Sequence, residues 1–434
     1  MKKGLINVYS LGCSKNLTDS ERLMRRLEAK GYEVEFESPE PEGEMVMVNT
    51  CGFILDAQQE SIDTILELSQ AKEEGRIGSI SVMGCLSERF MNDLKESLPE
   101  VDRWYGKFDW NAFIDELPDL SETEKVKDWE RSLTTPEGSA YLKISEGCNR
   151  FCAFCAIPLI TGRHKSRPIE EILEEVRALT DEGVREFNVI AQDLSSYGLD
   201  LYGRHALAEL VDRIADIEGV EWIRLHYAYP SDFPMDLLDV MARRDNVCKY
   251  IDIALQHISD KVLSNMRRHI TKQETLDLIA EMRRRVPGLQ IRTTLMVGFP
   301  GEGEEEFEEL MEFVRDARFE RMGAFAYSEE AGTWGEQNLD DNIPQEVKQE
   351  RLDRLMALQQ KISDAHNRSM IGKEVKVLVE EFTEDGRYAG RTQWDSPDVD
   401  CQVIFESEEP VEPGEFVHVK ITDSDEFDLF GTII

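Results

Sequence analysis

The chain has 434 residues, 41% hydrophobic and 32% charged, which is an ordinary composition for a water-soluble globular protein of about three domains. Its 88 acidic and 50 basic side chains give a formal net charge of −38, which disfavours binding to nucleic acid backbones and favours basic partners. No stretch approaches the roughly 20 apolar residues of a membrane helix, and no signal peptide is recognisable. We therefore expect a cytoplasmic protein that is not associated with a membrane.

Residues 1–135 predict an open parallel sheet flanked by helices, because short apolar runs alternate with helical patterns. The predicted strands are 5–10, 44–49 and 80–83, and the predicted helices are 18–30, 57–74 and 88–98.

Three cysteines occupy the same place in this alternation. Cys13, Cys51 and Cys85 each follow a predicted strand, precede a helix and lie beside a glycine. Because the carboxyl ends of parallel strands meet at one edge of a sheet, we expect the three thiols to converge. A single cysteine of this kind is commonly a small buried core residue. Three at one loop position instead predict a metal cluster, as do eight cysteines in a cytoplasmic chain.

Residues 118–136 are polar and predict a linker, after which the strand and helix alternation resumes. The helices include 169–182 and 272–286, and the predicted strands are 140–144, 185–191, 220–225, 250–255, 289–297 and 321–327. Six such units are too few for a closed eight-unit barrel and predict a partial one. Its chemistry would lie on the loops at the carboxyl ends of the strands.

The loop after the first of these strands holds Cys148, Cys152 and Cys155 in CxxxCxxC spacing. A 4Fe-4S cluster usually takes four thiolates, so three predict a cluster with one iron open to a ligand that is not protein. The alternative is a structural zinc site. Such sites are normally closed by four ligands, and the nearest candidate, His164, lies nine residues beyond Cys155.

CxxxCxxC with an aromatic residue before the last cysteine resembles the signature of radical S-adenosylmethionine (SAM) enzymes. The resemblance implies that these three cysteines hold the catalytic cluster, whose open iron binds SAM. It further implies that SAM is cleaved to methionine and a deoxyadenosyl radical. By the same resemblance Gln192, Gln256 and Gly298, in the matching loops, would contact SAM. Their structural alternatives are helix-capping side chains and a Gly-Pro turn.

The last part of the chain changes to a β pattern. Residues 344–369 predict a long amphipathic helix, and Gly, Pro and acidic turns then separate short strands. These strands are 375–379, 388–393, 401–405, 416–421 and 429–433. Five strands of this length predict a small OB-like barrel.

The whole α/β chain resembles the methylthiotransferase family of radical SAM enzymes. Its parts would be a methylthiotransferase domain (1–135), a radical SAM core forming a partial (βα)6 TIM-like barrel (136–369) and a TRAM domain (370–434). The resemblance implies a transferase that forms a C–S bond, with SAM and two 4Fe-4S clusters as cofactors. Cys13, Cys51 and Cys85 would hold the second, auxiliary cluster, and an electron donor and a sulfur carrier would be partners.

Charge separates two branches of that family, one acting on a tRNA adenosine and the other on an aspartate of small-subunit ribosomal protein S-12. Residues 371–434 contain 17 acidic and 5 basic side chains, a charge of −12. An RNA-binding barrel normally presents a basic groove, whereas an acidic one suits a basic ribosomal protein. We therefore predict methylthio addition to the β-carbon of an S-12 aspartate, with tRNA disfavoured as a partner.

Two segments support this choice. Residues 395–400 resemble the Asp-x-Pro-x-x-Asp segment in the barrel of the ribosomal-protein branch, and Glu329 and Glu330 stand where the tRNA branch tends to carry Arg-Pro. Residues 160–163 lack an Arg-Gly pair that is usual after the cluster loop. Two alternatives stay open, namely a tRNA adenosine methylthiotransferase and a non-catalytic iron–sulfur protein that binds ribosomes.

Overall fold

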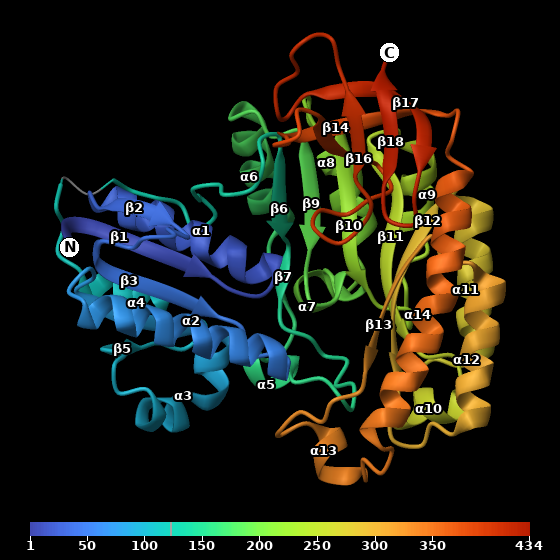
Figure 1. Ribbon diagram of the computed structural model, residues 1–434, viewed down its shortest axis with the longest axis horizontal. Coiled ribbons are helices and arrows are strands. Elements are labelled where there is room, and N and C mark those ends of the chain that lie inside the picture. The colour runs from blue at the N-terminus through green and yellow to red at the C-terminus, as the bar shows by residue number, and fades with distance from the viewer. Residues whose placement is uncertain (122–123) are drawn as a thin grey trace.

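The computed structural model describes residues 1–121 and 124–434 and places three main sheets along the chain (Figure 1). The first is parallel with strand order β2-β1-β3-β4-β5, and the second is parallel with order β13-β12-β11-β10-β9-β6. The third is a closed barrel of order β14-β15-β16-β18-β17. The structure thus confirms the expected sequence of open sheet, partial barrel and five-stranded barrel.

The first sheet is covered by helices on both faces. Leu23 and Leu27 of α1 pack with Phe113 of α4 on one face, and Ile65 of α2 packs with Leu94 of α3 on the other. The elements are β1 (Lys2–Ser10), α1 (Ser14–Ala29), β2 (Glu33–Phe36), β3 (Gly43–Thr50), α2 (Leu55–Glu73), β4 (Ser79–Gly84), α3 (Cys85–Ser97), β5 (Arg103–Trp104) and α4 (Trp110–Glu116).

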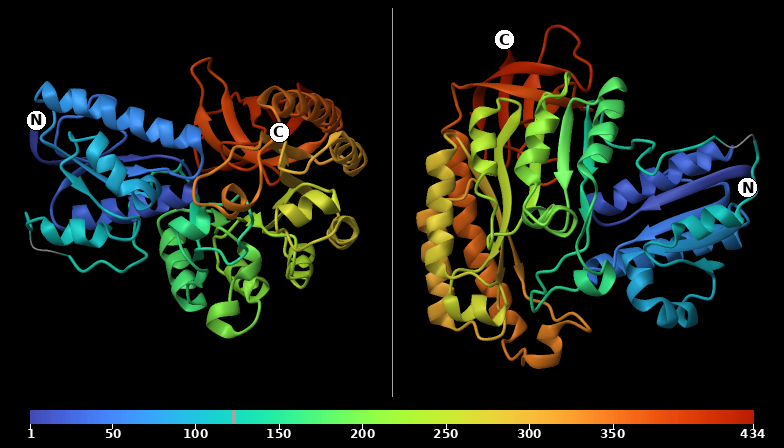
Figure 2. Two further views of the ribbon diagram at one scale, coloured as in Figure 1. Left: turned by 90° about the horizontal axis from the view of Figure 1, so that it is seen from below. Right: turned by 180° about the vertical axis from the view of Figure 1, so that it is seen from behind.

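The second sheet curves into the partial barrel, with its helices on the outer face (Figure 2). Its strands are β6 (Ser139–Lys143), β9 (Glu186–Ile190), β10 (Trp222–Ala228), β11 (Val247–Gln256), β12 (Gln290–Val297) and β13 (Arg321–Ala326). The helices are α5 (Ile157–Ile160), α6 (Ile169–Asp181), α7 (Leu199–Tyr202), α8 (Leu207–Ala215), α9 (Leu237–Arg243), α10 (Asp260–Asn265), α11 (Lys272–Arg285), α12 (Glu304–Ala317) and α13 (Trp334–Asn338). A short 3-10 helix, η1 (Leu194–Ser196), and the hairpin β7 (Ser145–Glu146) and β8 (Lys165–Ser166) complete this part.

The main core lies between this sheet and its outer helices. In α6 the buried residues Ile169, Ile172, Leu173 and Val176 recur at helical spacing and face the sheet. Acidic residues in the first turn of α6 favour its amino end, where the helix dipole is positive. The helix α14 (Gln345–Arg368) then leads to the barrel strands β14 (Glu374–Phe382), β15 (Tyr388–Thr392), β16 (Val403–Glu406), β17 (Phe416–Ser424) and β18 (Leu429–Ile433).

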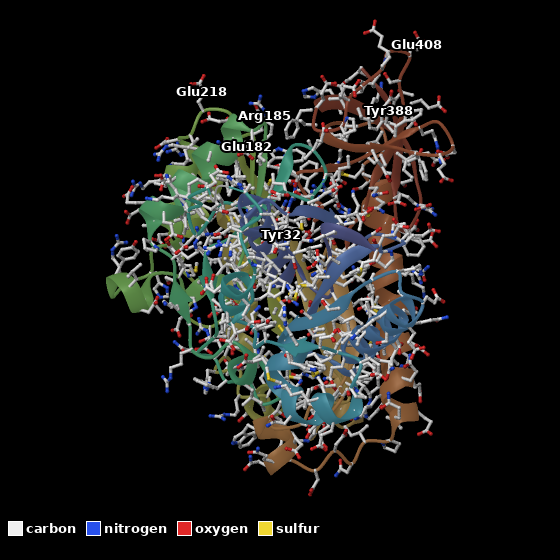
Figure 3. All side chains as sticks on the ribbon, turned by 90° about the vertical axis from the view of Figure 1, so that its left-hand side faces the viewer. Tyr32, Glu182, Arg185, Glu218, Tyr388 and Glu408 are labelled. Atoms are coloured by element: carbon white, nitrogen blue, oxygen red, sulfur yellow. The ribbon has the colours of Figure 1, made fainter. Side chains whose placement is uncertain are left out.

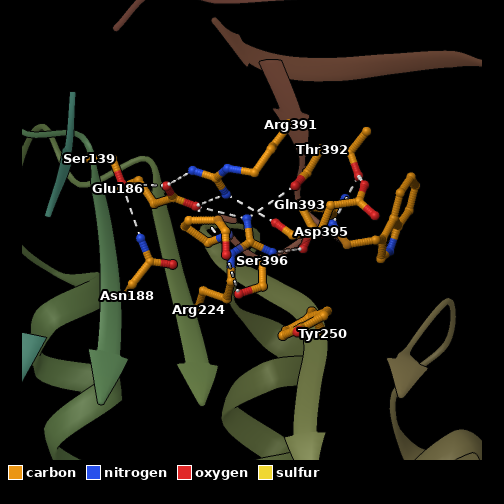
Figure 4. A network of polar contacts seen from close by, with 12 residues as sticks. Ser139, Glu186, Asn188, Arg224, Tyr250, Arg391, Thr392, Gln393, Asp395 and Ser396 are labelled. Atoms are coloured by element: carbon orange, nitrogen blue, oxygen red, sulfur yellow. Dashed lines mark hydrogen bonds and ion pairs between the residues drawn. The ribbon is translucent and has the colours of Figure 1, made fainter. Parts of the chain in front are cut away.

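Buried ion pairs fix the barrel to the amino ends of the partial-barrel strands (Figure 4). Glu186 accepts hydrogen bonds from Arg391 of the barrel at 2.6 Å and from Arg224 of β10 at 2.8 Å. Burial alone would raise the pKa of Glu186, but the two guanidinium groups hold it below its ordinary value. Separating the barrel from the sheet would leave these buried charges without a partner, which is costly, so the ion pairs hold the barrel firmly against the sheet.

The Asp-x-Pro-x-x-Asp segment takes part in the same docking. Asp395 pairs with Arg321 of β13 at 2.7 Å. Asp400 accepts a hydrogen bond from the Tyr250 hydroxyl of β11 at 2.9 Å. It also forms an ion pair with Arg292 of β12 at 3.3 Å. Both end carboxylates of the segment therefore face the partial barrel.

The two parallel sheets are oriented so that their chemical edges meet. The carboxyl ends of β1 and β3 point toward β7 and α5, next to the carboxyl half of the partial barrel (Figure 1). None of the helices within the described residues has the length and apolar character needed to cross a bilayer.

Candidate active site

The three cysteine loops of the first sheet touch one another. A Cβ added at Gly12, which adopts φ +93°, would lie 2.6 Å from Cys51 Sγ. A Cβ added at Gly52 would lie 2.5 Å from the Cα of Leu86, the residue after Cys85. The glycines beside the cysteines therefore permit this close approach, and the expected convergence of Cys13, Cys51 and Cys85 is present.

Asn16, in the first turn of α1, connects these loops. Its side-chain amide donates to the carbonyl of Leu11 at 3.0 Å and to that of Thr50 at 3.1 Å, just before two of the cysteines. Its side-chain oxygen accepts from the Cys85 thiol at 3.5 Å and from Lys107 at 3.3 Å. The buried Asn16 side chain thus contacts all three cysteine loops and fixes their positions relative to one another.

The three thiols differ in electrostatic environment. Burial raises the pKa of Cys51 and raises that of Cys85 to about 12. Cys13 is exposed at the edge, yet the surrounding protein desolvates its thiol, which alone would raise its pKa. The Lys15 ammonium and the backbone N–H of Asn16 outweigh this effect, so the pKa of Cys13 lies below its ordinary value.

The second group of cysteines lies on a single loop between β7 and α5. The Cys148 N–H donates to the Gly162 carbonyl at 3.2 Å, and the Cys155 N–H donates to the Cys152 carbonyl at 3.0 Å. Burial raises the pKa of the Cys148 thiol to about 12 and raises that of Cys155 as well. A bound metal cluster would be needed to hold such thiols as thiolates at neutral pH.

Two further residues contact the middle cysteine. Arg268 donates to Cys152 Sγ at 3.2 Å, and the Tyr229 hydroxyl lies 3.6 Å from the same sulfur. The Arg268 guanidinium also lies over the Tyr229 ring, 4.0 Å from its centroid. The Tyr229 hydroxyl donates its hydrogen to the Arg268 carbonyl at 2.8 Å, so the Arg268 guanidinium is the donor at this sulfur, and a cationic donor there suits a cluster ligand.

The two groups of cysteines lie next to each other. Cys85 packs against Ala156 and Ile160, which directly follow Cys155 in the chain. A buried charge network crosses the same boundary. Asp19 of α1 pairs with Lys107 at 3.1 Å and with Lys143 of β6, and Lys143 also pairs with Glu146 at 2.9 Å.

A second contact holds the Cys51 loop against the partial barrel. Arg89 of α3 donates to the Gly52 carbonyl at 2.6 Å and pairs with Glu330 at 3.2 Å. Both side chains are buried, and Gln58 also donates to Glu330 at 3.3 Å. Glu330, one of the two acids that stand where the tRNA branch tends to carry Arg-Pro, therefore helps to position the Cys51 loop through Arg89.

The residues expected to contact SAM lie at or just beyond the carboxyl ends of β9, β11 and β12. Gln192 donates to Glu146, while its side-chain oxygen is buried without a hydrogen-bond partner among the described residues. Gln256 has a left-handed backbone with φ 72°, and the Gly298 N–H donates to Glu302 at 2.9 Å. An unpaired buried oxygen fits a polar ligand. Contact with SAM stays a prediction for all three.

Neither cysteine group, as described, is arranged around a single metal ion. Within the described ranges, no set of three His, Cys, Asp or Glu side chains is arranged to hold one metal ion. His164 forms a 3.1 Å hydrogen bond with Ser166 instead. The thiolates of a four-iron cluster bind separate irons and so lie farther apart than the ligands of one zinc ion. The zinc alternative gains no support.

Models of three families match separate parts of the chain. They are the uncharacterized protein family UPF0004 at residues 5–106, the Radical SAM superfamily at residues 142–314 and the TRAM domain at residues 371–434.

Full-length relatives decide the family. The chain is 58% identical over 434 residues to ribosomal protein uS12 methylthiotransferase RimO of Parabacteroides distasonis, covering 100% of both chains. It is 49% identical to the RimO of Flavobacterium psychrophilum, covering 99% of this chain and 98% of that one. The chain belongs to the RimO family. Membership confirms a radical SAM methylthiotransferase whose cofactors are SAM and two 4Fe-4S clusters.

Solved structures agree with this fold. The radical SAM methyltransferase TsrM from Kitasatospora setae superposes with a TM-score of 0.54 at 16% identity, covering 75% of this chain and 72% of that one. The cobalamin-dependent radical SAM enzyme OxsB gives 0.50 at 14% identity, covering 82% and 56%. At such identities the likeness concerns the fold alone.

Several residues of the candidate site could not be predicted from the sequence. Asn16, Arg89 and Arg268 act on the cysteine loops from other elements. Asn16 lies close to Cys13, so its position was the only available signal. Arg89 and Arg268 have no distinguishing spacing, because their contacts come from the packing of distant segments.

Proposed function

We propose that this chain adds a methylthio group to the β-carbon of an aspartate of ribosomal protein uS12. The observation that carries the proposal is the adjacency of the two cysteine groups, seen in the packing of Cys85 on Ala156 and Ile160. A transfer that needs both clusters requires them to face one site.

Each group of cysteines would hold one cluster. We assign the radical SAM cluster to Cys148, Cys152 and Cys155, and the auxiliary cluster to Cys13, Cys51 and Cys85. When bound, the clusters and SAM supply the electron, the hydrogen-abstracting radical, the sulfur and the methyl group. The chain itself positions the loops through Asn16 and Arg89, and it stabilises the Cys152 thiolate through Arg268.

The acidic barrel would bind the basic ribosomal protein. Glu408 extends into solvent from the outer end of the barrel (Figure 3), and Glu406, Glu409, Glu412 and Glu415 are exposed around it. These carboxylates are separate from Asp395 and Asp400, which are used in docking. Exposed acids of one sign steer a basic partner and repel tRNA.

Three further points belong to this proposal. The domains would be 1–135, 136–369 and 370–434. The protein would work in the cytoplasm, where ribosomal proteins are available, with an electron donor and a sulfur carrier as partners. Gln192, Gln256 and Gly298 would contact SAM.

The direct test is anaerobic incubation of the reconstituted protein with SAM, a reductant, a sulfide source and recombinant uS12. Mass spectrometry should show a gain of methylthio mass on one aspartate. Bulk tRNA, incubated in parallel, should show none. Modification of tRNA adenosine with unmodified uS12 would overturn the proposal in favour of the tRNA branch, and release of no methionine would favour a non-catalytic binder.

A matched variant separates the cluster cysteines from other buried ones. Cys248 is buried between the partial barrel and the TRAM barrel, outside both groups. Cys248→Ala should retain both clusters and product formation, whereas alanine at any of the six assigned cysteines should not.

A further inference from the structure

Lys15 brings a buried positive charge into the site, next to Cys13. Only 8% of the residue is exposed, and its Nζ lies over the ring of Tyr227, 3.4 Å from the centroid. Lys15 lies two residues after Cys13, and Tyr227 lies at the carboxyl end of β10. The side chain therefore spans from the first cysteine group to the edge of the partial barrel where chemistry is expected.

No carboxylate among the described residues forms an ion pair with Lys15. Glu146, the carboxylate whose charge acts on Lys15, is already engaged, because it accepts from Lys143 at 2.9 Å and from Gln192. Asp19 is shared between Lys107 and Lys143. A cation–π contact offsets part of the lost hydration of an ammonium, but an anion stabilises it far more. The site thus holds a buried cation that no carboxylate of the described residues pairs with.

Tyr227 supports the same interpretation. It adopts φ 66°, a left-handed backbone that is rare for a bulky side chain because Cβ then crowds the backbone, and it is 37% exposed on an otherwise buried strand. Its N–H donates to Asp252 at 3.3 Å. Strained residues of this kind are concentrated at ligand sites. Here the strain places the ring beneath the Lys15 ammonium.

We propose that Lys15 binds the side-chain carboxylate of the aspartate that is modified. This inference rests on the proposed function, which brings one carboxylate next to the reacting β-carbon. A lysine ammonium at that point would favour aspartate over its neutral isostere asparagine. It would also disfavour an adenine base, which carries no negative charge. Lys15 would then be a residue that determines the class of substrate.

The test compares Lys15→Met with a matched control, Lys3→Met, which removes an exposed lysine near the other end of β1. For a uS12 peptide containing the target aspartate, Lys15→Met should raise KM and the Kd measured by fluorescence anisotropy roughly ten- to hundredfold. The KM for SAM should not change. Lys15→Arg, which keeps the charge, should recover part of the affinity, and Lys3→Met should behave as the unaltered protein.

A peptide with asparagine at the target position provides the decisive ratio. The unaltered protein should bind the aspartate peptide at least about tenfold more tightly than the asparagine peptide, and Lys15→Met should bind both alike. An unchanged ratio in Lys15→Met would overturn the inference, as would a raised KM for SAM with unaltered peptide binding. Should Lys15→Met lose iron, the ratio in Lys15→Arg decides, because this variant keeps the charge beside Cys13: a retained preference for the aspartate peptide supports the inference, and equal binding of both peptides overturns it. Failure of the unaltered protein to modify uS12 would instead count against the proposed function.

Discussion

The two groups of cysteines reach the same site by different routes. Cys148, Cys152 and Cys155 lie on one loop, so their proximity follows from spacing along the chain. Cys13, Cys51 and Cys85 come from three loops and meet only when β1, β3 and β4 pair in register. The comparison shows that one site is encoded locally, whereas the other exists only in the folded sheet.

The supporting residues differ in the same way. Asn16 connects the three loops of the first group through its own side chain. The second group needs no such connection and is instead contacted at one sulfur by Arg268. Loss of Asn16 should therefore impair the assembly of the first cysteine group. Loss of Arg268 should instead change the charge around the second.

The largest expected effect comes from the local loop. Cys152→Ala should abolish SAM cleavage, because two thiolates cannot hold a four-iron cluster. Deoxyadenosine, measured by chromatography after anaerobic incubation, should fall to the background of the assay without protein. Continued deoxyadenosine formation would contradict the assignment of this loop to the radical SAM cluster.

Cys51→Ala should separate the two groups. It removes one ligand of the auxiliary cluster and leaves the radical loop intact, so deoxyadenosine should form while the methylthio product is lost. Iron analysis should give about four irons per chain instead of about eight. Product formation by this variant would show that the first group does not supply the sulfur.

Asn16→Ala should weaken the first group without removing a ligand. Two buried carbonyls, those of Leu11 and Thr50, lose their donor, which should cost about 2 to 4 kcal/mol of unfolding free energy. Auxiliary iron should fall and radical-cluster iron should not. Asn111→Ala, at an exposed asparagine of α4, is the control and should change neither. Equal loss of iron from both groups would refute the local role of Asn16.

The smallest effect on the two cysteine groups should come from a substitution at the amino ends of the partial-barrel strands, where the TRAM barrel docks. Arg391→Met leaves Glu186 with one arginine and should cost about 3 to 5 kcal/mol of stability in urea unfolding. Activity per folded molecule should be unchanged. Arg387→Met, which removes an exposed pair with Asp385, should alter neither property. A changed ratio of product to deoxyadenosine in Arg391→Met would mean that the two ends of the sheet are coupled.

Much of the fold could be predicted because its signals are local. The strands of the partial barrel and the helix α14 have clear periodicity, and their observed bounds differ from the expected ones by a few residues. β5 and α4 were not predicted, since β5 has two residues and α4 seven. β2 was also missed because it is a four-residue edge strand whose residues are exposed or half-buried.

The site was predictable in its thiols and not in its supporting contacts. Cysteine spacing and loop position identify chemistry directly, because few other roles need that pattern. Lys15 and Arg89 have ordinary sequence surroundings. Their importance depends on Tyr227 and Glu330, which lie more than 200 positions away along the chain. Only the packed structure brings such partners together.

The docking of the TRAM barrel has a consequence for which residue of a substrate protein can reach the thiols. Because Glu186, Arg224 and Arg391 lock the barrel in place, it cannot swing toward the thiols. A partner held by the outer acids is therefore kept at a constant reach from the reacting centre. The fixed barrel would therefore select the residue to be modified by its distance from the basic surface that binds the barrel.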